Sequence, residues 1–166
     1  MNLSEYIHSG YVYNRRSRVL SEHLAKLIPE DLHILDVGCG DGLLAHLITQ
    51  KRPDLVLTGI DGRVRERSHI PVAPFDGQVI PYGDASFDGV MFVDVLHHTQ
   101  DQIILLREAA RVARKVIVIK DHSLNGLFAG PTLRLMDKIG NARHGVALPY
   151  NYWPRQKWLN TFEMLG

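Results

Sequence analysis

The sequence predicts an α/β fold in which helices cover a doubly wound, mainly parallel β-sheet. Short apolar runs alternate with helical patterns along the chain, as in strands buried on both faces of a parallel sheet. The apolar runs span 32–37, 55–60, 87–96 and 116–119. A glycine-rich turn joins the first run to a helical pattern. Because such sheets bind ligands at the carboxyl ends of their strands, a site is expected there.

Two helical patterns flank the first strand. The N-terminal one places apolar residues on one helix face and ends at Pro29. That face consists of Val19, Leu20, His23, Leu24 and Leu27. The second pattern spans 43–51 and is closed by Pro53. The order strand, glycine turn, helix is the first half of a βαβ unit.

The later segments are less regular. Residues 62–83 predict mostly loop with a weak strand at 78–80. Thr99 and Gln102 fit a capping box that opens a helix running to Arg114 and Lys115. The glycine- and proline-rich tail predicts two further helices, at 133–139 and 154–165.

Composition limits the classes of function. The 166 residues suit one domain, and 45% apolar with 22% charged residues is typical of a globular chain. A net charge of +1 offers no electrostatic footprint for nucleic acid, so a small or neutral partner is expected. The lone Cys39 excludes a disulfide within the chain and points to a cytoplasmic protein. No window reaches the roughly 18 apolar residues of a membrane span.

The motif that carries chemistry is the glycine turn after the first strand. A dinucleotide fingerprint that starts at Gly38 would need a third glycine at the position of Leu43. The pattern is instead D-x-G-x-G-x-G from Asp36 to Gly42. The carboxylate of Asp36 would repel a pyrophosphate and suits an amino-bearing ligand.

On these residues, the segment of roughly 10–120 resembles the class I S-adenosylmethionine-dependent methyltransferases, in particular the type 11 family. The resemblance implies a Rossmann-like sheet and S-adenosylmethionine as cofactor. It implies that the methionine and ribose parts are held by Asp36, Gly38, Cys39, Gly40 and Gly42. Asp61, followed by Gly62, ends the second strand where the family grips both ribose hydroxyls.

The resemblance extends to later motifs. Asp76 and Gly77 match the adenine-contacting pair, although Phe75 stands where the family has a glycine. Ile80-Pro81-Tyr82 and Ser86-Phe87-Asp88 follow in the family's order. Val93 and Asp94 match residues that touch the methionine moiety. Arg16 either pairs with the cofactor carboxylate or belongs to a solvated helix face.

Candidate catalytic and acceptor residues come after these motifs. His97, His98 and Asp94 are candidate bases, although strand-end histidines often only satisfy backbone groups and methyl transfer can proceed by alignment alone. The acceptor site is expected to include Tyr150, Tyr152, Trp153 and His122, of which the aromatic residues could equally be core. No metal site is expected, because no H-x-x-x-H pair with a nearby acid occurs.

The resemblance divides the single domain 1–166 into an N-terminal cap helix (1–30), a cofactor-binding core (31–120) and an expected acceptor-site region (121–166). The expected function is methyl transfer to a small molecule; a cofactor-binding module without activity is the alternative, and an oxidoreductase is disfavoured by Leu43. About five strands are visible, without the family's C-terminal β-hairpin, so the chain looks cut inside the fold. The strand 116–119 would then be an exposed edge that a second copy or the tail covers.

Overall fold

The computed structural model describes residues 3–126, 129–141 and 149–165. Its strands are β1 (His33–Val37), β2 (Val56–Asp61), β3 (Val72–Pro74), β4 (Phe87–Val93) and β5 (Ala113–Lys120). Its α-helices are α1 (Leu3–Leu27), α2 (Leu43–Lys51), α3 (Gln102–Val112), α4 (Ala129–Asn141) and α5 (Arg155–Leu165). A short 3₁₀ turn, η1 (Leu96–His98), follows β4.

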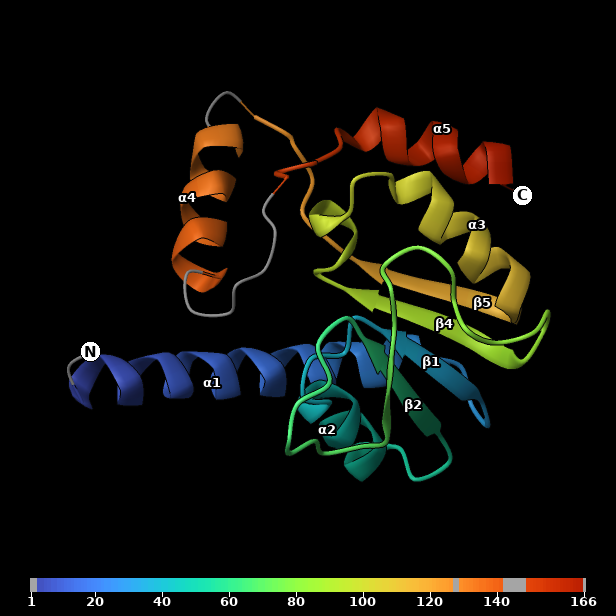
Figure 1. The fold of residues 1–166 in the computed structure, drawn as a ribbon, viewed down its shortest axis with the longest axis horizontal. Helices are drawn as coiled ribbons and strands as arrows, with labels where there is room; N and C mark the ends of the chain where they lie inside the picture. The colour runs from blue at the N-terminus through green and yellow to red at the C-terminus, as the bar shows by residue number, and fades with distance from the viewer. Residues whose placement is uncertain (1–2, 127–128, 142–148, 166) are drawn as a thin grey trace.

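The strands form one five-stranded sheet in the order β3-β2-β1-β4-β5, and every neighbouring pair is parallel (Figure 1). The predicted doubly wound, parallel α/β fold is therefore confirmed. The chain moves outward from β1 to β3 on one side and from β4 to β5 on the other. Ligands of such sheets bind where this order reverses, next to the carboxyl ends of β1 and β4.

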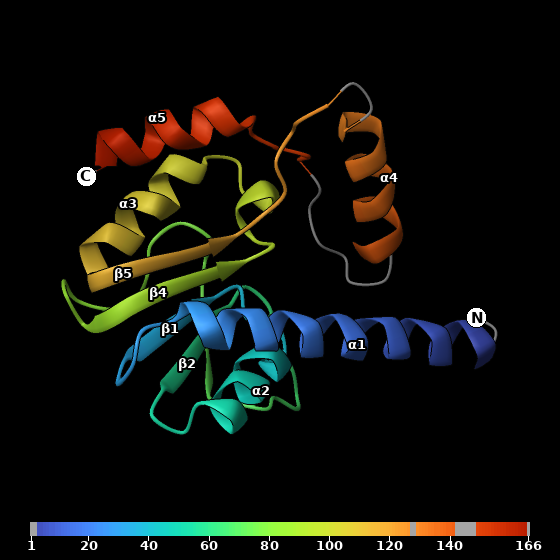
Figure 2. The same ribbon diagram turned by 180° about the vertical axis from the view of Figure 1, so that it is seen from behind.

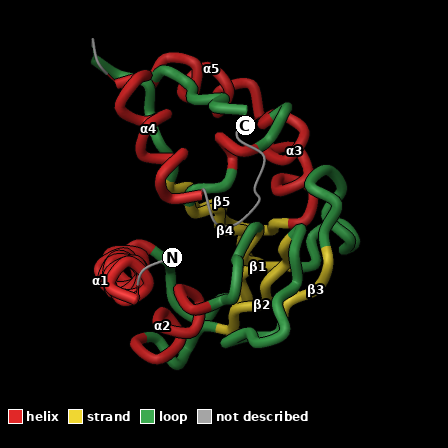
Figure 3. Tube along the Cα trace, turned by 60° about the vertical axis from the view of Figure 1, so that its left-hand side comes forward, coloured by secondary structure: helices red, strands yellow, loops and turns green. Residues whose placement is uncertain are grey.

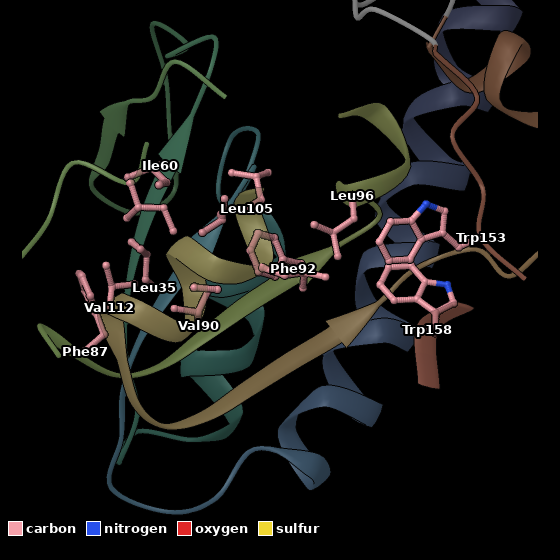
Figure 4. Packing of buried hydrophobic residues seen from close by; sticks show 14 residues of the cluster. Leu35, Ile60, Phe87, Val90, Phe92, Leu96, Leu105, Val112, Trp153 and Trp158 are labelled. Carbon is pink, nitrogen blue, oxygen red and sulfur yellow. The ribbon is translucent and has the colours of Figure 1, made fainter. Parts of the chain in front are cut away.

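Helices cover both faces of the sheet, with α1 and α2 on one side and α3 and α5 on the other (Figure 3). The side chains of β4 alternate accordingly: Val90 and Phe92 pack in the cluster under α3, and Met91 packs in the cluster under α1 and α2. Trp153 and Trp158 close the first cluster beside Leu96 (Figure 4). The alternation explains why β4 is apolar at successive positions.

Helix α1 buries a face that is rotated from the predicted one. Leu24 is buried as predicted and Leu20 is partly buried against the core, but Ser21 is buried while Val19 and Leu27 are 45% and 70% exposed. The hydroxyl of Ser21 donates to a carbonyl one turn earlier in the helix, so this small polar residue is satisfied locally. A small residue lets α1 pack closely on α2. Among the described residues, no helix is apolar and long enough to cross a bilayer.

The prediction of a weak strand at 78–80 was wrong. The strand of this region is β3, which lies earlier in the chain. The carboxylate of Asp76 accepts hydrogen bonds from the backbone of Gln78 and Val79, and this turn occupies the N–H groups that a strand would use. Strand β3 forms one edge of the sheet and ends in Pro74, a position where the missing N–H costs little.

Helix α3 is shorter at both ends than predicted. Its N-cap is Asp101, which accepts from the backbone of Ile103, instead of Thr99. It ends at Val112 and passes directly into β5. Arg114 and Lys115, predicted as the helix end, belong to β5 and pair with Asp88 of the neighbouring strand.

The two predicted tail helices are present as α4 and α5. Helix α4 stands beyond the carboxyl ends of β4 and β5, opposite the projecting half of α1 (Figures 1 and 2). Among the described residues, β5 pairs with β4 alone. A single bridge between Ser123 and Trp153 connects the tail to the chain just past β5. The outer edge of β5 is thus not covered by a strand of the described tail.

Candidate active site

The glycine loop between β1 and α2 has a backbone that only glycine adopts easily. Gly38 and Gly40 have φ of 73° and 63°. The N–H of Gly38 donates to the carbonyl of Ile60 over 2.8 Å, which ties the loop to β2. A Cβ on Gly38 would lie 2.6 Å from a methyl group of Val95. The loop can therefore approach the end of β4 only without a side chain at this position.

Asp61, at the end of β2, fastens the same loop. Its Oδ2 accepts from the N–H of Gly40 and its Oδ1 from the N–H of Arg63, both over 2.8 Å. The carboxylate thus fixes the turn from one side and the start of the next loop from the other. Carboxylate oxygens offer more than one lone pair each, so this arrangement is compatible with further donors such as ribose hydroxyls.

Two other loop residues face the protein interior. Cys39 packs its sulfur against Gly59, where a Cβ would lie only 2.4 Å from Sγ. Burial, together with the nearby charge of Asp36, raises the pKa of the Cys39 thiol, so it remains protonated and unreactive. Gly42, with φ of 74°, is the N-cap of α2 and lies against Ile70.

Asp36 is a buried carboxyl at the end of β1, with only 3% exposure. Burial, and next the charge of Asp61, raise the pKa of Asp36 to about 7. A cation near this carboxyl would favour its ionised form. Its burial beneath the loop is therefore compatible with a ligand that brings a positive charge to this edge of the sheet.

A cleft of about 400 Å³ opens at the carboxyl ends of the central strands. It is lined by Gly38, Gly62, Phe75, Asp76, Gly77, Val95, His98, Thr99 and Leu105. Four predicted cofactor residues and one predicted base, His98, thus line one space. The predicted cofactor residues outside this lining are Arg16, Asp36, Cys39, Gly40, Gly42, Asp61, Val93 and Asp94.

Asp94 follows β4 in a left-handed conformation, with φ of 58°. Its carboxylate pairs with the guanidinium of Arg16, from α1, and with the ammonium of Lys120, from β5. Both cations contact this carboxylate, and Asp94 does not line the cleft, so the geometry gives no support to its predicted role as a base. The structure also pairs Arg16 with Asp94, whereas the sequence left open a contact with the cofactor carboxylate or a solvated helix face.

His97 lies at the centre of a buried cluster and is 2% exposed. Its Nδ1 is 2.5 Å from Oδ1 of Asp121, which follows β5, and its Nε2 is 3.3 Å from Oδ2 of Asp137, on α4. Burial opposes the imidazolium form, but the hydrogen bond to Asp121 and the charges of both aspartates and Asp94 raise the pKa of His97. The ring also stacks on Tyr152, with centroids 5.4 Å apart.

Asp121 and Asp137 were missed by the sequence reasoning. Asp121 had a usable signal, because it ends a strand just as Asp61 ends β2. Burial raises the pKa of its carboxyl, but hydrogen bonds from His122 and His97 outweigh burial and lower it. Asp137 had no such signal, because its burial depends on how α4 docks.

The predicted acceptor residues surround this cluster and do not line the cleft. Tyr152 donates its hydroxyl to Asp137, and His122 Nδ1 lies 3.4 Å from Oδ1 of Asp94. Trp153 is 3% exposed and packs on Trp158, so it belongs to the core. Tyr150 lies beside Tyr152, with ring centroids 6.4 Å apart.

A family model described as "Methyltransferase domain" matches residues 11–160. The chain belongs to this methyltransferase family. Its sheet is that of the class I enzymes, whose cofactor is S-adenosylmethionine, and the resemblance inferred from the motifs is confirmed. The cleft suits that cofactor, because it is lined by Gly38, where a Cβ would meet Val95, and by Gly62, the residue next to the strand-end Asp61.

Two relatives are methyltransferases by name. The chain is 30% identical over 131 residues to the 27-O-demethylrifamycin SV methyltransferase of Amycolatopsis mediterranei, covering 66% of this chain and 48% of that protein. It is 29% identical over 136 residues to the O-methyltransferase cnsE of Penicillium expansum, covering 68% and 49%. The chain spans about half the length of these curated relatives.

Solved structures share the fold. A possible histamine N-methyltransferase from Thermotoga maritima superposes with a TM-score of 0.69 at 14% identity, covering 99% of this chain and 77% of that one. The YcgJ protein of Bacillus subtilis gives 0.66 at 19% identity, covering 91% and 68%. At such low identity these likenesses support the fold alone.

Proposed function

We propose that this chain transfers a methyl group from S-adenosylmethionine to a hydroxyl group of a small molecule. The observation that carries the proposal is the shared cleft, in which the glycine cradle and His98 line one space. The relatives named as O-methyltransferases support oxygen as the acceptor atom. The net charge of +1 favours a small, uncharged acceptor over a nucleic acid.

Residues from the ends of several strands would hold the cofactor. The bare backbone of Gly38 and Gly62 would allow close approach, and Asp61 would keep the loop in place while accepting ribose hydroxyls. Asp76 and Gly77, which also line the cleft, would border the adenine base. When bound, S-adenosylmethionine supplies an electrophilic methyl group on a sulfonium. Asp36, ionised in the presence of this positive charge, would contribute electrostatic stabilisation.

The reaction forms a C–O bond and breaks the C–S bond, and the hydroxyl proton leaves to a base. His98 would accept that proton, a role supported by its position in the cleft lining and by its contact with His97, with ring centroids 4.0 Å apart. Alignment of the two reactants and exclusion of water would supply the main part of the rate enhancement, a contribution of up to roughly 7–11 kcal/mol.

Titration calorimetry with S-adenosylhomocysteine tests the cofactor half of this proposal. We expect binding, and we expect Asp61→Ala to weaken it by at least tenfold, since the variant releases the glycine loop. Absence of binding to the folded wild-type chain would overturn the proposed function.

Transfer of a labelled methyl group to a panel of small phenols and alcohols tests the second half. His98→Gln should lower turnover while leaving S-adenosylhomocysteine affinity nearly unchanged. The matched control is His46→Gln, which removes a histidine on α2 that stacks on His69 away from the cleft lining. Equal turnover in both variants would contradict a role for His98.

A cofactor-binding module without transferase activity is the second candidate. It is favoured by one observation, namely that the predicted acceptor residues do not line the cleft. Tight binding of S-adenosylhomocysteine with no labelled product from any acceptor would support it.

Further features bear on the cellular location and the oligomeric state of the protein. The single Cys39 and near-neutral charge favour action in the cytoplasm. The outer edge of β5 has no strand beside it among the described residues and would pair with a second copy. Light scattering on the purified chain should therefore give the mass of a dimer, and a monodisperse monomer would contradict this pairing.

A further inference from the structure

The buried histidine cluster contains a set of donor atoms that converge on one point. The ligand atoms of His97, His98 and Asp137 all lie within 4.8 Å of one another. The two histidines belong to η1 and the aspartate to α4, so the set is assembled by the fold from positions 40 residues apart. This is why the sequence, which lacks an H-x-x-x-H pair, predicted no metal site.

His97 is oriented as metal-binding histidines usually are. Its Nδ1 is held by the carboxylate of Asp121, which fixes the ring and leaves Nε2 as the second donor atom. That Nε2 is buried and has no hydrogen-bond partner among the described residues, although Asp137 is near. A buried nitrogen without a partner is costly, so the position favours an additional ligand.

The spacing of the two donor atoms fits a shared ion. Nε2 of His97 and Oδ2 of Asp137 are 3.3 Å apart. Two ligands about 2.1 Å from one ion subtend about 100° at this separation, close to a tetrahedral angle. The hydroxyl of Tyr152 donates to Asp137 and so orients the carboxylate from the other side.

A second set, formed by His97, Asp121 and His122, is less suitable. Asp121 Oδ1 lies 2.5 Å from His97 Nδ1, which is hydrogen-bond distance and too close for two ligands of one ion. It also accepts from the backbone N–H of His122. Asp121 is thus the residue that positions His97.

We propose that His97, His98 and Asp137 bind one divalent transition-metal ion, for which Zn²⁺ is the probe. Two imidazoles and a carboxylate favour such ions over Mg²⁺ and Ca²⁺, which prefer all-oxygen ligands. Because His98 also lines the cleft, the ion would lie beside it, with a coordination position open to the acceptor. The binding site is independent of the transfer reaction. The role of the ion rests on the proposed function: with the ion bound, His98 would be a ligand and no longer the base, and the metal would lower the pKa of the bound hydroxyl so that its proton leaves to solvent.

Calorimetric titration of the chelator-treated full chain with Zn²⁺ tests the site, together with the visible absorption of bound Co²⁺. We expect one equivalent to bind with the spectrum of a tetrahedral or five-coordinate ion. His98→Gln and Asp137→Asn should each weaken Zn²⁺ binding at least tenfold, whereas the control His46→Gln should leave it unchanged. Circular dichroism of each variant would establish that it is folded.

The outcomes separate this proposal from the proposed function. If the wild-type chain binds S-adenosylhomocysteine but no stoichiometric Zn²⁺, the metal site is overturned and the transferase proposal stands. Zn²⁺ binding that His46→Gln abolishes and Asp137→Asn retains would equally overturn the site.

Discussion

The glycine loop and the histidine cluster lie at the same end of the sheet, but different forces hold them. The loop is fixed by backbone conformation and by bonds to its neighbour β2, such as that from Gly38 to Ile60. The cluster is fixed by side-chain charges that come from η1, from the end of β5 and from α4. Backbone sterics therefore stabilise the glycine loop, and side-chain electrostatics stabilise the histidine cluster.

The difference has an energetic consequence. A loop built from left-handed glycines fails when a Cβ is added, whatever the pH. A buried group of ionised residues fails when one partner is removed, because the remaining charge loses its compensation. Variants that address one region at a time should therefore separate the two kinds of stabilisation.

The largest effect is expected from Asp121→Ala. It leaves the buried ring of His97 without its closest partner and removes the acceptor of the His122 backbone N–H. The free energy of unfolding should fall by about 3–5 kcal/mol, measured by urea denaturation. The control Asp84→Ala breaks the pair of an 81% exposed carboxylate with Arg111 and should cost at most about 1 kcal/mol. Equal losses would show that the cluster is not held by buried charge.

The next largest effect is expected from Gly38→Ala. The free energy of unfolding should fall by about 2–4 kcal/mol, and binding of S-adenosylhomocysteine should be lost. The new Cβ meets both left-handed strain and Val95 at 2.6 Å. The control Gly126→Ala adds a Cβ at φ of 101° with no atom within 4 Å, so it reports the backbone cost alone. If both variants lose the same stability, packing against Val95 contributes nothing.

Asp36 provides a pH test on the cofactor side. Its pKa is about 7 in the folded chain and 3.8 as a reference. Between these pH values the folded chain retains a proton that the unfolded chain has lost, so the free energy of unfolding falls as pH rises. Asp36→Asn removes this dependence. The difference between the free energy of unfolding of the variant and that of the wild type should therefore shift in favour of the variant by about 1–3 kcal/mol between about pH 4 and about pH 8. Urea denaturation with parallel pH profiles would contradict a raised pKa.

The sequence predicted best what depends on neighbouring residues. Helix α2 and the strands β1, β2 and β4 follow from apolar periodicity, and Asp61 from its place at a strand end. Strand β3 was misplaced because Val72-Ala73-Pro74 has no apolar run of its own and gains strand structure only by pairing with β2. The face of α1 was rotated because burial of Ser21 depends on close packing against α2.

The site residues also differ in whether local sequence or tertiary packing determines their position. Asp36 and the glycines form one contiguous motif, so their spacing carries the information. Asp137 acquires its environment from the docking of α4, which no local pattern specifies. Trp153, predicted in the acceptor site, lies in the core because α5 brings Trp158 against it.

The smallest effect is expected from Arg16→Ala, and it decides between two roles. The guanidinium is 50% exposed and pairs with Asp94, so its loss should cost at most about 1 kcal/mol. Lys120 remains beside Asp94 and still pairs with that carboxylate. If Arg16 only links α1 to the end of β4 through its ion pair with Asp94, the affinity for S-adenosylhomocysteine should change less than threefold in calorimetry. This corresponds to a change of about 0.7 kcal/mol in the binding free energy. A tenfold or larger loss would mean that Arg16 leaves Asp94 to bind the cofactor carboxylate, as the sequence alone suggested, and that α1 closes over the cleft when the cofactor binds.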